Sequence, residues 1–187
     1  MPGLVCYFSG MKDLYHLSPG DLVVWIIPRA HEASILEWIA TYALRGPVSV
    51  LDNGDRFEVK HLMRSLRRHT HQMTETLSRI RATRVSTGYQ LIRILEETPA
   101  EVIPHILLDF LALFEDERVP LTESYHLLGI AIGHLHRLRT YAPVVICLHP
   151  ARVQQPERAG LADVVLGIAD QVFTPEMPRV NSPARLL

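Results

Sequence analysis

Apolar runs of strand length recur along the chain and alternate with segments of helical spacing. The run DLVVWIIP at 21–28 is continuously apolar, which is typical of a strand covered on both faces in a parallel sheet. A shorter segment, RIRATRV at 79–85, alternates charged and other residues and predicts a strand near a sheet edge. The remaining runs are VSVLD at 48–52, HILLDFLALF at 105–114 and APVVICLHP at 142–150.

The segments between these runs carry apolar residues at helical spacing. The first such segment starts near Ile35 and is stopped by RGP at 45–47. Further helices are expected at 59–77, 88–98 and 122–141, the last with Thr122 as its N-cap. The segment DVVLGIADQVFTP at 163–175 predicts one or two closing strands.

The alternation of strands and helices predicts an α/β fold with a mainly parallel central sheet and helices on both faces. We expect a single domain over residues 1–175 and a loosely ordered tail over 176–187. Ligands of such sheets bind at the carboxyl ends of the strands. The candidate site therefore lies among the strand-end segments, which are 28–34, 52–57, Asp109 onward and His149 onward.

Composition narrows the function classes. The chain has 187 residues, 48% of them hydrophobic, and a formal net charge of −1, which argues against a globally basic nucleic-acid binder. No run approaches the roughly 20 apolar residues that span a bilayer, so we expect a cytoplasmic protein without a membrane segment. Cys6 and Cys147 lie in apolar surroundings and are expected to be buried thiols.

The strand ends and their spacing resemble the RecA-like recombinase ATPases. SGMKDLYHLSPGDLVVWI (9–26) is similar to the family's lead-in to the first core strand, and VSVLDNGDRFEVKHL (48–62) to its second strand. ATRVSTGYQLIRIL (82–95) is similar to the strand and helix before the third core strand. HILLDF (105–110) has the form of a Walker B strand, and VVICLHP (144–150) ends where the family has a polar sensor residue. The resemblance implies a RecA-like P-loop NTPase fold.

The phosphate-binding loop departs from that family. A Walker A loop, G-x-x-x-x-G-K-[ST], needs glycines so that its N–H groups can turn toward the phosphates, a lysine for their charge and a hydroxyl for Mg²⁺. Aligned without gaps, this chain has Pro28 and Ala33 at the glycines, Ser34 at the lysine and Ile35 at the hydroxyl. All four chemical functions are absent.

Other positions point the same way. Ser34 and Glu37 form an S-x-x-E pattern that predicts a capping box, which gives the helix N-terminus an internal acceptor instead of a phosphate. Gly54 stands where the resemblance implies the glutamate that activates water, unless the alignment shifts by one residue to Asp55. Asp109 and His149 keep the places of the Walker B and sensor residues.

The resemblance and these departures together predict a catalytically inactive, pseudo-ATPase domain without a cofactor. Members of the family pack side by side with nucleotide at the junction, so a subunit without its own site can still serve a neighbour. We therefore expect a protein partner, such as a RecA-like recombinase or a repair-complex subunit, or a homo-oligomer.

An alternative is DNA binding through an arginine-rich face. Residues 56–93 hold nine Arg and Lys against two Glu. A basic surface of this kind can meet a phosphate backbone. The resemblance implies DNA-contacting loops after the third and fourth core strands, of which 114–124 is acidic and 151–160 mildly basic. The candidate contact residues are Arg64, Arg67, Arg68, Arg79, Arg81, Arg152 and Arg158.

A third possibility is an enzyme with a rebuilt pocket at the strand ends, using His31, Asp52, Asp109 and His149. The histidine pairs at 69–71 and 134–136 fall in expected helices, where residues two apart point about 200° away from one another. Neither pair can share an ion, so the sequence predicts no metal site.

Overall fold

The computed structural model describes residues 17–28, 31–150 and 158–174, and a six-stranded sheet forms its centre. The expected tail at 176–187 lies outside the described residues. All six strands fall within segments predicted above, although only the end of 163–175 is a strand. The strands are β1 (Leu22–Ile26), β2 (Val48–Asp52), β3 (Ile80–Arg84), β4 (His105–Leu108), β5 (Val144–Leu148) and β6 (Gln171–Phe173).

Every strand pair in the sheet is parallel, as predicted. The order across the sheet is β3-β2-β4-β5-β1-β6, so β1 lies next to one edge strand and β2 next to the other. The chain moves in one direction from β1 through β2 to β3. It then reverses, passes through β4 and β5, and ends beyond β1 at β6.

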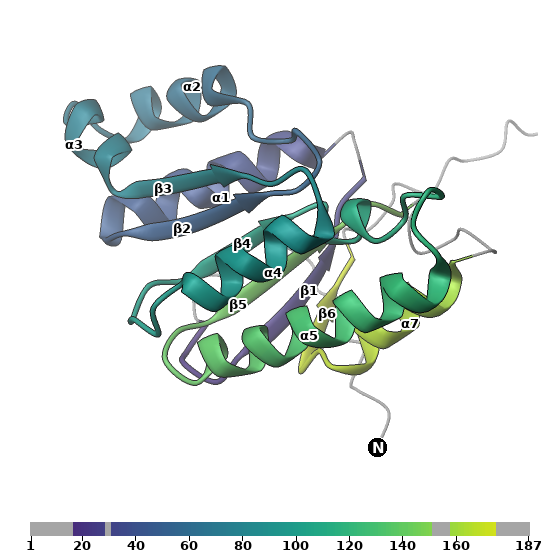
Figure 1. The fold of residues 1–187 in the computed structure, drawn as a ribbon. Coiled ribbons are helices and arrows are strands. Elements are labelled where there is room, and N and C mark those ends of the chain that lie inside the picture. The colour runs from purple at the N-terminus through teal and green to yellow at the C-terminus, as the bar shows by residue number, and fades with distance from the viewer. Residues whose placement is uncertain (1–16, 29–30, 151–157, 175–187) are drawn as a thin grey trace, which may run out of the picture.

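This reversal places helices on both faces of the sheet (Figure 1). Parallel crossovers are right-handed, so helices that connect strands in opposite directions lie on opposite faces. One face carries α1 (Glu32–Arg45), α2 (Val59–His69) and α3 (Met73–Ser78). The other carries α4 (Gly88–Glu97), α5 (Leu121–Arg139) and α7 (Ala159–Gly167). The prediction of helices on both faces is therefore confirmed.

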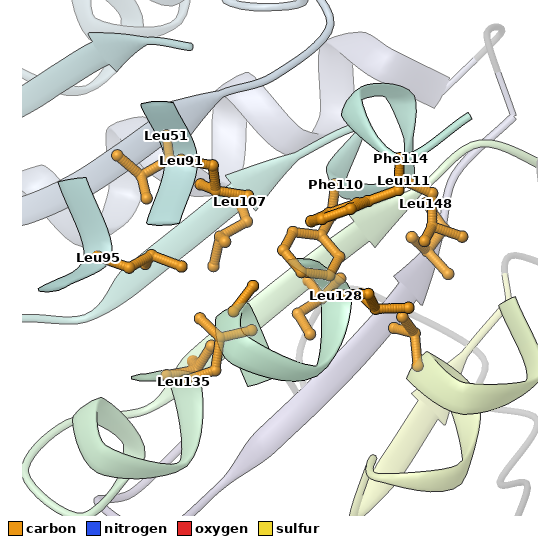
Figure 2. Close-up of a cluster of buried hydrophobic side chains, with 14 of the residues drawn as sticks. Leu51, Leu91, Leu95, Leu107, Phe110, Leu111, Phe114, Leu128, Leu135 and Leu148 are labelled. Carbon is orange, nitrogen blue, oxygen red and sulfur yellow. The ribbon is translucent and has the colours of Figure 1, made fainter. Parts of the chain in front are cut away.

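Each inner strand contributes alternate side chains to two separate apolar clusters. Val23 of β1 packs against α1, whereas its neighbour Val24 packs toward α5 and α7. Figure 2 shows the second cluster, in which Phe110 and Phe114 lie with ring centroids 5.3 Å apart. Because both faces are covered, β4 and β5 are buried along their whole length.

Three predicted elements differ in the structure. The helix expected at 59–77 is two helices, because Thr70 is extended and its hydroxyl accepts a hydrogen bond from the Gln72 N–H at 3.0 Å. Helix α5 begins at Leu121 after Pro120, so Thr122 is not its N-cap. The first half of 163–175 is helical, and only Gln171–Phe173 is a strand.

The described helices contain no segment with the length and apolar character required to cross a membrane.

Candidate functional site

The carboxyl ends of β1, β4 and β5 border a small pocket. β5 lies between β1 and β4 in the sheet, and the connections that leave β1 and β5 run in opposite directions. Such a divergence opens a crevice in α/β sheets. The volume of the pocket is about 30 Å³. Its lining residues are Ile27, Ile35, Arg56, Leu108, Asp109, Cys147, Leu148 and His149.

An ion pair between Arg56 and Asp109 lies in this pocket. The guanidinium Nε and one terminal nitrogen are each 3.5 Å from Asp109 Oδ2. The Asp109 side chain is 4% exposed and that of Arg56 is 26% exposed. A cation supplied by the chain therefore lies on the carboxylate for which the sequence resemblance predicted the Walker B role. Sequence reasoning missed this pair, since nothing in the local pattern links two residues so distant in the chain.

Asp109 has an unusual backbone conformation that aims its side chain at the pocket. Its φ of 46° and ψ of 50° lie in the left-handed region, directly before the 3-10 turn η3 (Phe110–Leu113). Non-glycine residues adopt this region uncommonly, with Asp and Asn among those that do. The bend ends β4 and starts the turn within a single residue.

Gly54 is required by its contact with Asp109. A Cβ atom at Gly54 would lie 2.6 Å from Asp109 Oδ2 and 2.7 Å from its Cβ, distances that real Cβ atoms essentially never show. The predicted place of the water-activating glutamate therefore has no room for a side chain while Asp109 keeps this position.

Asp52 has a structural role in the same turn. Its carboxylate accepts backbone N–H bonds from Arg56 at 2.8 Å, Phe57 at 3.1 Å and Gly54 at 3.4 Å. These bonds fold residues 53–57 into a tight loop and so present Arg56 toward Asp109. Asp52 does not line the pocket.

The start of α1 differs from the predicted capping box. The helix begins at Glu32, and the N-cap is His31, whose side chain makes no capping bond. Ser34 therefore lies inside the first turn. Glu37 does not reach back to the helix start but pairs with Arg68 of α2 at 3.5 Å. The capping-box prediction is wrong because the helix starts three residues earlier than the S-x-x-E pattern implied.

The residues aligned with the phosphate loop have different surroundings. Ile35 is buried and lines the pocket, whereas Ala33 is exposed and Pro28 and Ser34 are half-buried. The backbone N–H of His31 donates to Pro28 O at 2.8 Å. An apolar side chain thus faces Asp109 from the helix start.

Cys147 and His149 line the far side of the pocket. Burial, followed by the negative charge of Asp109, holds the pKa of the Cys147 thiol well above its usual value. A thiol in this state is a poor nucleophile. Of the four residues in the enzyme hypothesis, the structure brings together Asp109 and His149, while His31 and Asp52 do not line the pocket.

The candidate DNA-binding residues do not form one surface. Arg79 donates to Ala43 O and Leu44 O at the end of α1 and pairs with Glu75. On the opposite face of the sheet, Arg81 pairs with Glu101 at 3.2 Å. Arg152 lies outside the described residues.

Arg158 also has an internal role. Its guanidinium donates to Phe114 O at 2.7 Å, to Val119 O at 2.9 Å and to Ser124 Oγ at 3.0 Å. It therefore holds together the loop before α5, and its donors point into the protein.

Helix α2 retains an exposed basic stripe. Lys60, Arg64 and Arg67 follow one another at i, i+4 and i+7 and are all exposed. Within residues 17–28, 31–150 and 158–174, no carboxylate forms an ion pair with any of the three. Arg68, next to the stripe, is held by Glu37.

No group of three or more potential metal ligands occurs in the part of the chain that the structure describes. Comparison of the sequence with models of known protein families finds no match. A search among curated proteins finds no match either.

Proposed function

We propose that the chain is a RecA-like domain whose nucleotide site is filled by its own side chains, and that it works by binding another protein. The carrying observation is the Arg56–Asp109 ion pair. The partner class that the family resemblance suggests is a RecA-like recombinase, a repair-complex subunit or a second copy of the chain.

Charge and space in the pocket support an inactive site. A catalytic Mg²⁺ at Asp109 would have to displace the guanidinium of Arg56, which already neutralises this carboxylate. The pocket volume of about 30 Å³ matches a single water molecule, whereas pockets for drug-sized ligands occupy about 300–1,000 Å³. Ile35 supplies apolar surface where a nucleotide site needs a hydroxyl for the metal.

The strand order supports the RecA-like assignment. A sensor residue that contacts both a phosphate loop and a Walker B carboxylate must come from a strand between the two. β5 lies between β1 and β4, and His149 follows its last residue. The strand order therefore agrees with the arrangement that the RecA-like resemblance implies, in which the sensor strand lies between the other two.

Exposed apolar side chains support protein binding. Most of the large exposed apolar residues lie on the three helices of one face of the sheet. Apolar side chains exposed together on one face are typical of interaction surfaces. They are Tyr89 of α4, Leu121, Tyr125 and Ile130 of α5, and Val164 of α7. Val59, at the start of α2 on the other face, is also exposed and offers a matched control.

The test is affinity purification of the wild-type chain from its native cells, followed by reconstitution with the purified partner. Ile130→Asp should weaken the reconstituted complex at least tenfold, and Val59→Asp should leave it unchanged. A complex that neither substitution affects, or the lack of any reproducible partner, would contradict the proposal.

The stripe on α2 favours a second candidate, which is DNA binding. Lys60, Arg64 and Arg67 present three cations at helical spacing without an acidic partner among the described residues. Such a stripe matches a phosphate backbone and gives sequence-independent affinity that falls with salt.

A further inference from the structure

A row of polar side chains crosses the sheet near the amino ends of three strands. Ser49 of β2 is paired in register with Arg81 of β3 on one side and with His105 of β4 on the other. These are the first positions on their strands that face α4. The next row toward the carboxyl ends contains Leu51 and Leu107, which belong to the apolar cluster, and Thr83 on the edge strand β3. On β2 and β4, the side chains on this face thus change from apolar to polar within two residues toward the amino ends of the strands.

This row runs along one side of a cavity of about 180 Å³, from exposed Arg81 at its mouth through Ser49 to buried His105 at its floor. The cavity is well separated along the strands from the Asp109 pocket. On this face of the sheet, α4 covers β2 and β4, whereas the edge strand β3 stays largely exposed. The loop after α4 forms the opposite wall. The remaining lining residues are Leu51, Thr83, Ile94, Thr98, Pro99, Glu101 and Ile103.

His105 is the buried polar group of this cavity. The residue is 4% exposed, and its Nε2 has no hydrogen-bond partner among the described residues. Burial, followed by the positive charge of Arg137, lowers the pKa of His105 to about 4, so the ring is neutral at neutral pH. A buried polar atom without a partner destabilises the folded chain. Nε2 itself has almost no accessible surface in the structure, so a bound molecule supplies the missing bond when the ring turns slightly toward the cavity.

Two opposite charges stand at the cavity mouth. Arg81 and Glu101 pair at 3.2 Å, with side chains 61% and 47% exposed. An exposed pair of this kind contributes little to stability. A ligand with both charges can therefore separate the two side chains at small cost, because each finds a new partner.

We propose that this cavity binds a small zwitterion of the α-amino acid class, with its carboxylate on Arg81, its ammonium on Glu101 and its side chain directed toward His105. The volume is below the range of about 300–1,000 Å³ for drug-sized ligands, as a free amino acid requires. Ser49 and Thr83 add hydroxyls along the path between the mouth and the floor. The site is independent of the nucleotide pocket and of the proposed partner.

The experiment measures the melting temperature of the full chain with each of the twenty L-amino acids added singly at about 10 mM. A ligand present at about one hundred times its Kd should raise Tm by roughly 5 °C or more. Acetate and methylammonium, which each carry half of the charge pattern, should give no rise.

Two variants tie the rise to the cavity. Arg81→Gln and Glu101→Gln should each abolish it, whereas Arg93→Gln, which removes a similar exposed ion pair on α4, should preserve it. Because a substitution of buried His105 can unfold the chain, the second readout is the imidazole NMR signal of wild-type His105, which should shift on ligand addition. The absence of a rise with all twenty, or a rise that survives both Arg81→Gln and Glu101→Gln, would overturn the proposal.

Discussion

Arg56 and Asp109 are 53 residues apart in the chain, yet the guanidinium of the first lies on the carboxylate of the second at the end of the sheet. The turn that Asp52 folds and the left-handed backbone of Asp109 both aim these side chains into the same pocket. The pair therefore results from two local structures, which make it a fixed part of the fold.

Arg56→Ala should destabilise the chain, because it removes the guanidinium that pairs with the nearly buried carboxylate of Asp109. We expect a loss of about 1–3 kcal/mol in the free energy of unfolding, measured by urea denaturation. Arg93→Ala, which removes the exposed pair with Glu97, should leave it almost unchanged. Equal effects from the two variants would show that the buried pair has no special role.

Gly54→Ala tests the contact between the β2 turn and Asp109. The new methyl group would lie 2.6 Å from Asp109 Oδ2, so the turn or the carboxylate must move. The expected cost is about 1–3 kcal/mol in thermal or urea unfolding. Gly129→Ala is the control, because a Cβ there meets nothing within 4 Å and alanine favours the helix. A Gly54→Ala variant as stable as wild type would contradict the described turn.

The buried His105 predicts an acid-sensitive stability. Its pKa is about 4 in the folded chain and about 6.5 in the unfolded chain, so the unfolded state binds more protons between these values. Stability is therefore complete above about pH 6.5 and falls by up to about 3 kcal/mol as the pH drops toward 4.

Burial is the main cause of the lowered pKa of His105; Arg137 of α5 lowers it further, and Glu101 raises it. Urea unfolding at several pH values should give a slope that His105→Leu reduces. An identical slope in wild type and His105→Leu would assign the acid sensitivity to other groups.

The stripe on α2 predicts a salt-dependent DNA affinity. If it contacts phosphates, the double variant Arg64→Glu and Arg67→Glu should weaken binding at least tenfold and flatten the dependence of log Kd on log salt by about two units. Arg81→Gln, on the opposite face, should have no effect. A chain that binds no DNA at low salt would remove this candidate.

Much of the fold follows from patterns within the sequence. The apolar runs at 48–52 and 142–150 predict buried parallel strands because only a sheet covered on both faces accepts them, and both are observed. The run at 163–175 was misread in its first half, which continues a helix that starts at Ala159 and buries Leu161, Ala162 and Val165 at helical spacing. A short apolar stretch taken by itself does not distinguish such a helix from a strand.

The site was less accessible to sequence reasoning. Asp109 and His149 were placed at the strand ends by their position after apolar runs, and both line the pocket. The roles of Arg56 and Arg158 depend on contacts 53 and 44 residues away, which no local pattern reports. The basic residues look alike in sequence, and their internal partners separate them only once the chain is folded.

Calorimetric titration of the wild-type chain with magnesium-ATP tests the central claim most directly. Because Arg56 occupies Asp109 and Ile35 lines the same pocket, we predict that magnesium-ATP does not bind with a Kd tighter than about 1 mM. Arg56→Ala should not restore binding, because the lysine and hydroxyl of a phosphate loop remain absent. Micromolar binding of magnesium-ATP to the wild-type chain would contradict the account.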